Sequence, residues 1–164
     1  VPAGADDVLK QLGVLSLEIQ QLPRDGYPFR WPDTFPYMSV CSTSNHDMNV
    51  LRSWWKHDYT AAQQLYDLVL HHDLTAPDEA TPDMCEEILA QNLGSSSMLA
   101  IFPIQDWLSI DADLRNPDPD SERVNNPMSV DNRWDYRMHI PLETLVAAAE
   151  FNKKVRMLIA QSGR

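Results

Sequence analysis

The chain of 164 residues carries 24 acidic and 13 basic side chains, which gives a formal net charge of −11. A surface this negative repels phosphate backbones, so nucleic acid is disfavoured as a partner, whereas neutral ligands such as sugars are compatible. Hydrophobic residues make up 43% of the chain, enough for one globular domain or part of one. No apolar run approaches the roughly 18 residues of a membrane helix, so we expect no membrane association.

The first third of the chain predicts a helix and two strands on either side of a proline-rich loop. Residues 5–12 have helical spacing and end before a glycine. Residues 14–19 alternate apolar and polar side chains, which is the period of a strand. Residues 23–36 carry four prolines with aromatic residues between them, so we expect an ordered loop there. Residues 37–42 predict the second strand.

Two helices are predicted in the middle of the chain. A long helix from Asn49 onward carries a stripe of apolar residues that we expect to be buried. The stripe consists of Leu51, Trp55, Ala62, Leu65 and Val69. The next helix opens at Thr81, which suits an N-cap, and the following proline and aspartate suit a first turn. Its expected buried face consists of Cys85, Ile88, Leu89 and Leu93.

The last third of the chain predicts one more strand and one more helix. Residues 97–103 form an apolar run too short for a helix, which favours a parallel strand buried on both faces. Asp106 is a candidate cap for a short turn over residues 107–110. A proline-rich loop follows, and residues 141–163 predict the last helix. Its inward face is expected to consist of Leu142, Leu145, Val146 and Ala149.

Strands alternate with helices along the chain, which indicates an α/β fold with parallel strands and flanking helices. Three parallel strands with open edges make a poor free-standing domain. The chain begins at Val1 without an initiator methionine. We therefore expect it to be the last part of a larger enzyme. Cys41 and Cys85 follow no metal-ligand spacing and are expected to be buried free thiols.

His46 and Asp47 are the strongest candidates for a functional site. They follow the second predicted strand, and parallel α/β enzymes keep their chemistry at the carboxyl ends of strands. Asp47 has an alternative role as the cap of the helix that begins near Asn49. Arg123 and Asn125, in the loop after the third strand, either bind substrate or only hold that loop in place.

Several short segments, in this order, carry a resemblance that runs nearly from end to end. They are LGVLSLEIQ at 12–20, SVCSTSNHDMNVLRSWW at 39–55, AIFPIQDWL at 100–108, ERVNNP at 122–127, WDYRMH at 134–139, EFN at 150–152 and SGR at 162–164. Together they resemble the C-terminal part of the 4-alpha-glucanotransferases, also called amylomaltases or disproportionating enzymes. The resemblance is closest to the branch with the cytosolic plant enzyme and its bacterial relatives.

The resemblance implies that residues 1–164 are the C-terminal part of a single catalytic (β/α)8 (TIM) barrel domain. The chain would supply the last three β/α units, with the sixth, seventh and eighth strands. The parent would be a cytoplasmic enzyme that moves α-1,4-glucan segments between malto-oligosaccharides by a retaining mechanism, without a metal or coenzyme. Its partners would be maltose, malto-oligosaccharides and starch-like or glycogen-like polymers, together with the remainder of the parent barrel.

The same resemblance assigns roles to the candidate residues. Asp47 matches the third catalytic acid of the family, which grips hydroxyls of the donor sugar and favours its distorted, oxocarbenium-like ring. His46 matches a histidine that hydrogen-bonds the same sugar. Arg123 and Asn125 match a loop whose residues bind substrate.

The chain also departs from the family pattern. Asn45 stands where a threonine is common, and the 123–128 loop lacks a glycine. The nucleophile and the acid/base would lie before Val1, so the fragment alone is expected to be inactive. Two alternatives stay open. One is a non-catalytic carbohydrate-binding or interaction module that uses aromatics of residues 27–35, and the other is an α-glucan hydrolase of the same barrel class.

Overall fold

The chain forms a parallel sheet, and the computed structural model describes residues 4–164 except the side chain of Asp6. The strands are β1 (Ser16–Ile19), β2 (Ser39–Ser42) and β3 (Leu99–Ala100). They lie in the order β1-β2-β3, and the register pairs Val40 with both Leu17 and Leu99. The predicted α/β class, with parallel strands and flanking helices, is confirmed.

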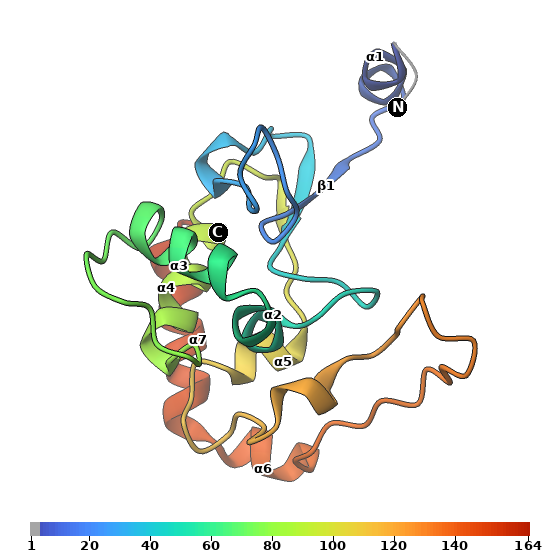
Figure 1. Cartoon of the computed structure of the whole chain (residues 1–164). Coiled ribbons are helices and arrows are strands. Elements are labelled where there is room, and N and C mark those ends of the chain that lie inside the picture. The colour runs from blue at the N-terminus through green and yellow to red at the C-terminus, as the bar shows by residue number, and fades with distance from the viewer. Residues whose placement is uncertain (1–3) are drawn as a thin grey trace.

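Helices occupy the connections and the C-terminal part of the chain. They are α1 (Ala5–Gln11), α2 (Leu51–His57), α3 (Tyr59–Leu68), α4 (Pro82–Leu93), α5 (Ile104–Leu108), α6 (Leu142–Ala147) and α7 (Ala149–Gln161), with short 3-10 helices at Pro32–Thr34 and Pro119–Glu122. Figure 1 shows α1 standing apart from the body, at the amino end of the arm that leads into β1. Within residues 4–164, no helix combines the length and apolarity that crossing a bilayer requires.

Helix α4 forms as its sequence predicts. The Thr81 hydroxyl accepts a hydrogen bond from the backbone N–H of Met84, and Pro82 fits the first turn because its missing N–H needs no partner there. The predicted face is fully or nearly fully buried, and Gly94 follows the last helical residue. Cys85 on this face and Cys41 on β2 are both buried and free, as expected.

The long helix predicted from Asn49 is divided in two. Asp58 leaves the helical conformation, with φ −121° and ψ 67°, and its side chain accepts from the N–H of Ala61. An aspartate can thus end α2 and cap α3 at the same position. The predicted apolar stripe is nevertheless buried throughout.

The prediction for the last helix is partly wrong. Ala148, with ψ 70°, lies outside the helical conformation and separates α6 from α7. The inward face of α6 therefore does not continue in register into α7. Leu142 and Val146 are exposed, whereas Phe151 and Leu158 of α7 enter the core. Leu145 packs against the core as predicted, but Ala149 is exposed, so a single helical period across residues 141–163 identifies only one of the four predicted inward residues.

The prediction of a third strand buried on both faces is also wrong. Of the predicted residues 97–103, only Leu99 and Ala100 pair with β2, and the side chains of Leu99 and Ile101 are exposed. Leu17 on β1 is exposed as well. Because β1 and β3 are the edges of this sheet, their apolar side chains lack the second layer that buries a central parallel strand.

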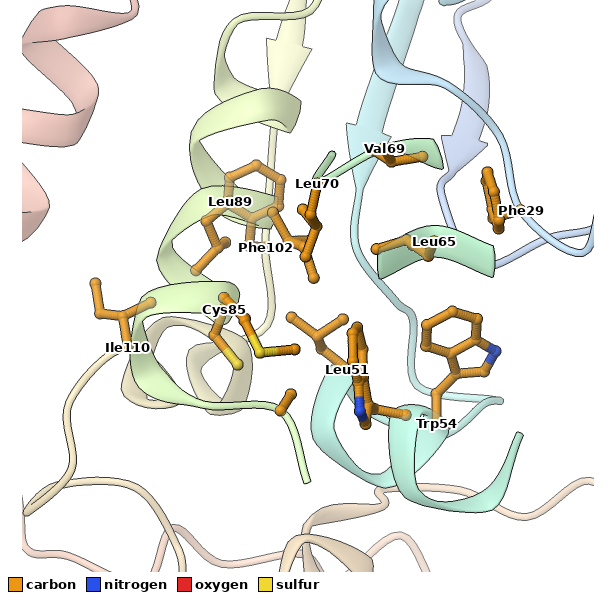
Figure 2. Close-up of a cluster of buried hydrophobic side chains, with 14 of the residues drawn as sticks. Phe29, Leu51, Trp54, Leu65, Val69, Leu70, Cys85, Leu89, Phe102 and Ile110 are labelled. Carbon is orange, nitrogen blue, oxygen red and sulfur yellow. The ribbon is translucent and has the colours of Figure 1, made fainter. Parts of the chain in front are cut away.

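The core lies between the sheet and helices α2, α3 and α4 (Figure 2). Leu51, Leu65 and Leu89, one from each of these helices, are at most 1% exposed. Burial of a side chain of this size contributes roughly 1.5 to 3 kcal/mol. Trp55 is completely buried, and its indole N–H donates to the carbonyl of Pro77 at 2.8 Å. This packing fixes the start of α2, immediately after the candidate site.

Candidate functional site

The loop between β2 and α2 carries His46 and Asp47. Thr43 and Ser44, directly after β2, are buried, and the chain then turns outward. The amide oxygen of Asn45 accepts from the backbone N–H of Asp47 at 2.8 Å, which is the hydrogen bond of an Asx turn. Asparagine at this position, a departure from the family pattern, is therefore compatible with a local turn.

The two candidate side chains lie together on the surface. Nε2 of His46 is 3.3 Å from Oδ2 of Asp47, and their side chains are 56% and 47% exposed. An imidazole beside a carboxylate presents both a nitrogen and acceptor oxygens to a neutral polar ligand. The pair is therefore accessible and chemically suited to binding hydroxyl groups.

The alternative role of Asp47 as a helix cap is not observed. Helix α2 begins at Leu51, and its N-cap residue, Val50, makes no side-chain capping bond. The N–H of Leu51 instead donates to Oδ1 of Asp106 at 2.9 Å. The sequence predicts Asp106 as the cap of its own short turn, but this residue lies inside α5 and serves the start of a different helix.

Asn125 joins the second loop to the first. Its backbone N–H donates to the carbonyl of His46 at 2.9 Å, and its side-chain amide donates to Oδ1 of Asp47 at 2.5 Å. Its own amide oxygen accepts from the side chain of Asn132 at 2.6 Å, which sets the orientation of the Asn125 amide. One oxygen of Asp47 is thus held by Asn125, and the other faces His46.

Arg123 braces the same loop. Its guanidinium donates to the carbonyl of Asn125 at 2.9 Å, to the side-chain oxygen of Asn49 at 3.0 Å and to the carbonyl of Asp47 at 3.2 Å. Of the two roles left open by the sequence, these contacts correspond to holding the loops in place. The structure therefore brings all four predicted site residues together, although their contact with a sugar stays a prediction.

Trp134 is a neighbour that sequence reasoning did not assign to the site. Its ring centroid lies 5.0 Å from that of His46, and the two rings are tilted by 45°. The residue is exposed and has a positive φ of 55°, a conformation that costs energy for a bulky side chain. The sequence signal that could have assigned Trp134 to the site is a tryptophan in a polar loop, outside any apolar stripe that would bury it.

Two buried carboxyl groups lie beneath the loops. Burial raises the pKa of Asp106, and the hydrogen bonds from Thr43, Leu51 and Ser44 oppose that shift. Burial also raises the pKa of Glu122 to about 7, although the positive charge of Arg52 lowers it. Sequence patterns do not reveal either shift, because they do not show that these acids are enclosed.

Metal chemistry has no evident ligand set in the described part of the chain. Among residues 4–164, no group of three or more His, Cys, Asp or Glu side chains is close enough to hold an ion. What the site offers is a carboxylate, an imidazole, an oriented amide and an exposed indole. Such a set can bind the hydroxyls and apolar face of a sugar.

Comparison with known proteins identifies the family. Residues 1–143 match the family model described as 4-alpha-glucanotransferase. The chain is 32% identical over 165 aligned positions to the 4-alpha-glucanotransferase DPE2 of Oryza sativa subsp. japonica, covering 100% of this chain and 17% of that protein. It is 29% identical to the 4-alpha-glucanotransferase of Chlamydia caviae, covering 94% of this chain and 29% of that protein. The chain therefore belongs to the 4-alpha-glucanotransferase family.

The fold comparison agrees with this assignment. The amylomaltase from Streptococcus agalactiae, solved in complex with acarbose, matches 100% of this chain and 30% of its own length, with a TM-score of 0.74 and 17% identity. The chain spans less than a third of the length of each of these relatives. The family assignment therefore applies to these 164 residues.

Proposed function

We propose that this chain is the C-terminal part of the catalytic domain of a cytoplasmic 4-alpha-glucanotransferase. The parent would move α-1,4-glucan segments between malto-oligosaccharides by a retaining mechanism. One observation carries the proposal: the loop that follows β2 and the segment that follows the 3-10 helix Pro119–Glu122 bring His46, Asp47, Arg123 and Asn125 into one group of polar contacts. This is the carboxyl end of a parallel sheet, where barrel enzymes bind their substrates.

We assign β1, β2 and β3 to the sixth, seventh and eighth strands of a (β/α)8 barrel. The exposed apolar side chains of Leu17, Leu99 and Ile101 support the assignment, since edge strands of this kind are stabilised by further strands and helices. The remainder of the barrel would cover them. The same remainder would supply the nucleophile and the acid/base, so the isolated chain would be inactive.

In the proposed mechanism Asp47 acts on the donor sugar. A retaining glycosidase-type reaction passes through an oxocarbenium-like transition state and uses two other carboxyl groups, one as the nucleophile and one as the acid/base. Asp47 would accept hydrogen bonds from sugar hydroxyls, and its negative charge would stabilise the positive charge that develops on the ring. Asn125 would keep the carboxylate oriented before substrate arrives, and His46 would hydrogen-bond the same sugar. No step assigned to these residues calls for a metal or coenzyme.

The carbohydrate-binding module is a weaker candidate. It depends on aromatic residues of the 27–35 loop, but Phe29 is completely buried and Phe35 nearly so. Tyr27 and Trp31 pack edge to face with their centroids 4.7 Å apart. The loop therefore uses most of its aromatic surface for internal packing. An α-glucan hydrolase of the same barrel class would share the site and differ in its acceptor.

The product distribution from maltotriose tests the proposal. The full-length protein is incubated with maltotriose, and the products are separated by chain length. Glucose together with glucans longer than maltotriose is the expected result. Glucose and maltose without longer products would indicate a hydrolase.

A titration of the 164-residue chain with maltoheptaose tests the module. The proposal expects no robust conversion of malto-oligosaccharides by this chain, and such conversion would overturn it. Saturable binding that survives Asp47→Ala but fails in Trp31→Ala would favour the module instead.

A further inference from the structure

Helix α5 carries two adjacent polar residues, Gln105 and Asp106, that are almost completely buried. They are 5% and 1% exposed. Burying a carboxylate is costly unless its oxygens are hydrogen-bonded, so the contacts that compensate this one identify what it holds. Neither side chain reaches the surface or belongs to the four residues of the candidate site.

The carboxylate of Asp106 accepts hydrogen bonds from both ends of the loop that carries His46 and Asp47. Oδ2 accepts from the hydroxyls of Thr43 at 2.5 Å and Ser44 at 2.8 Å, shortly before the site pair. Oδ1 accepts from the backbone N–H of Leu51 at 2.9 Å, shortly after it. A single rigid carboxylate therefore fixes the separation between the two ends of this loop.

Gln105 holds the base of the second loop. Its side-chain amide donates to the backbone carbonyl of Glu122 at 3.2 Å, one residue before Arg123. Glu122 is itself 1% exposed, so this contact lies in the interior. The neighbouring residues 105 and 106 thus each anchor one of the two loops that meet at the site.

We propose that Gln105 and Asp106 form a positioning pair that sets the two site loops against each other. The pair touches no substrate and acts through the hydrogen bond between the Asn125 N–H and the His46 carbonyl, at 2.9 Å, and through the Asp47 contacts beside it. The catalytic consequence rests on the proposed function. A displacement of about 1 Å at a preorganised group can cost about 100-fold in rate.

Hydrogen exchange of the 122–134 segment tests the positioning directly and independently of activity. Asp106→Ala should speed exchange in this segment of the full-length protein, because the loop that accepts the Asn125 N–H is released. Asp106→Asn should retain protection, since its oxygen can accept from Leu51 while its amide donates to the two hydroxyls. Asp111→Asn is the matched control. Within the described residues 4–164, the Asp111 carboxylate accepts only from the N–H groups of Asp113 and Leu114 on its own turn.

The kinetic arm uses the maltotriose reaction at equal concentrations of folded enzyme. Asp106→Ala should lower kcat about 100-fold, and Asp106→Asn should stay within about tenfold of wild type. If Asp106→Ala does not fold, the paired variant Thr43→Val with Ser44→Ala removes the two hydroxyl contacts to Oδ2 from the loop side, keeps the contact of the Leu51 N–H with Oδ1, and should also lower kcat.

The outcomes of the two arms are distinguishable. Unchanged exchange and unchanged kcat in the folded variants that break these contacts would overturn the positioning role. A wild-type enzyme that makes no longer glucans would refute the proposed function. The exchange comparison would then still decide whether Asp106 sets the loop that carries His46 and Asp47.

Discussion

Replacement of Arg123 by lysine isolates the contribution of the guanidinium to the site. The arginine spans three acceptors, on Asn125, Asn49 and Asp47, at 2.9, 3.0 and 3.2 Å. A lysine ammonium keeps the charge but lacks the planar fork, so it can replace about one of these bonds. Two lost bonds at about 0.5 to 1.5 kcal/mol each give about 1 to 3 kcal/mol. This corresponds to a decrease of about 5- to 150-fold in kcat/KM.

The assay is kcat/KM of the full-length enzyme for maltotriose at a temperature where every variant stays folded, with Arg137→Lys as the control. Arg137 is exposed, and in the part of the chain that the structure describes its side chain donates only to the carbonyls of Asp135 and Tyr136. The control should behave as wild type. An Arg123→Lys enzyme with unchanged kcat/KM would refute the argument that this guanidinium braces the Asp47 loop.

Three further predictions concern stability. The folded chain keeps a proton on Glu122 up to a pKa of about 7, whereas the unfolded chain releases it near 4.5, so stability falls as the pH rises through this window. Glu122→Gln should remove this decrease in the free energy of unfolding, which is about 2 to 4 kcal/mol in the wild type. Urea unfolding at a pH below and a pH above the window measures it, and an equal decrease in wild type and variant would contradict the prediction. Arg164→Met loses guanidinium bonds of 2.6 to 2.8 Å to three backbone carbonyls of residues 93–97. Calorimetry should show a decrease of about 1.5 to 4.5 kcal/mol in the free energy of unfolding, and an unchanged free energy would contradict the prediction. Leu89→Ala should cost about 2 to 5 kcal/mol in the same measurement because the side chain is completely buried, and a cost below about 1 kcal/mol would contradict the core assignment.

The sequence predicted the elements better than their edges. Local chemistry determined the start of α4, because Thr81 and Pro82 act within one turn. The break at Asp58 was missed because an aspartate that lies outside the apolar stripe is also compatible with an exposed position in an unbroken helix. The exposure of Leu99 was missed for a different reason: apolar residues show that a strand can be buried, and only the neighbouring elements decide whether it is.

The sequence predicted the candidate site from residues that follow a strand, but it did not predict the buried residues that hold the site loops in place. His46 and Asp47 follow a strand closely, so their position is local information. Asp106 is 55 residues away from Leu51, whose N–H it accepts, and periodicity gives no sign of such a contact. Long-range polar contacts of this kind depend on how β2 and β3 align, which the sequence pattern leaves open.

The proposed action of Asp47 on the sugar is tested by comparing full-length wild type with Asp47→Asn. The substituted asparagine has nearly the same shape as the aspartate but no negative charge to stabilise the oxocarbenium-like ring. Asp131→Asn, an exposed change in the neighbouring loop, is the control. Each enzyme is incubated with maltotriose, and the products are resolved as a ladder of chain lengths. Wild type and the control should make glucose and longer glucans, and Asp47→Asn should lose this activity by several orders of magnitude. A ladder that survives in Asp47→Asn would show that Asp47 does not act on the sugar.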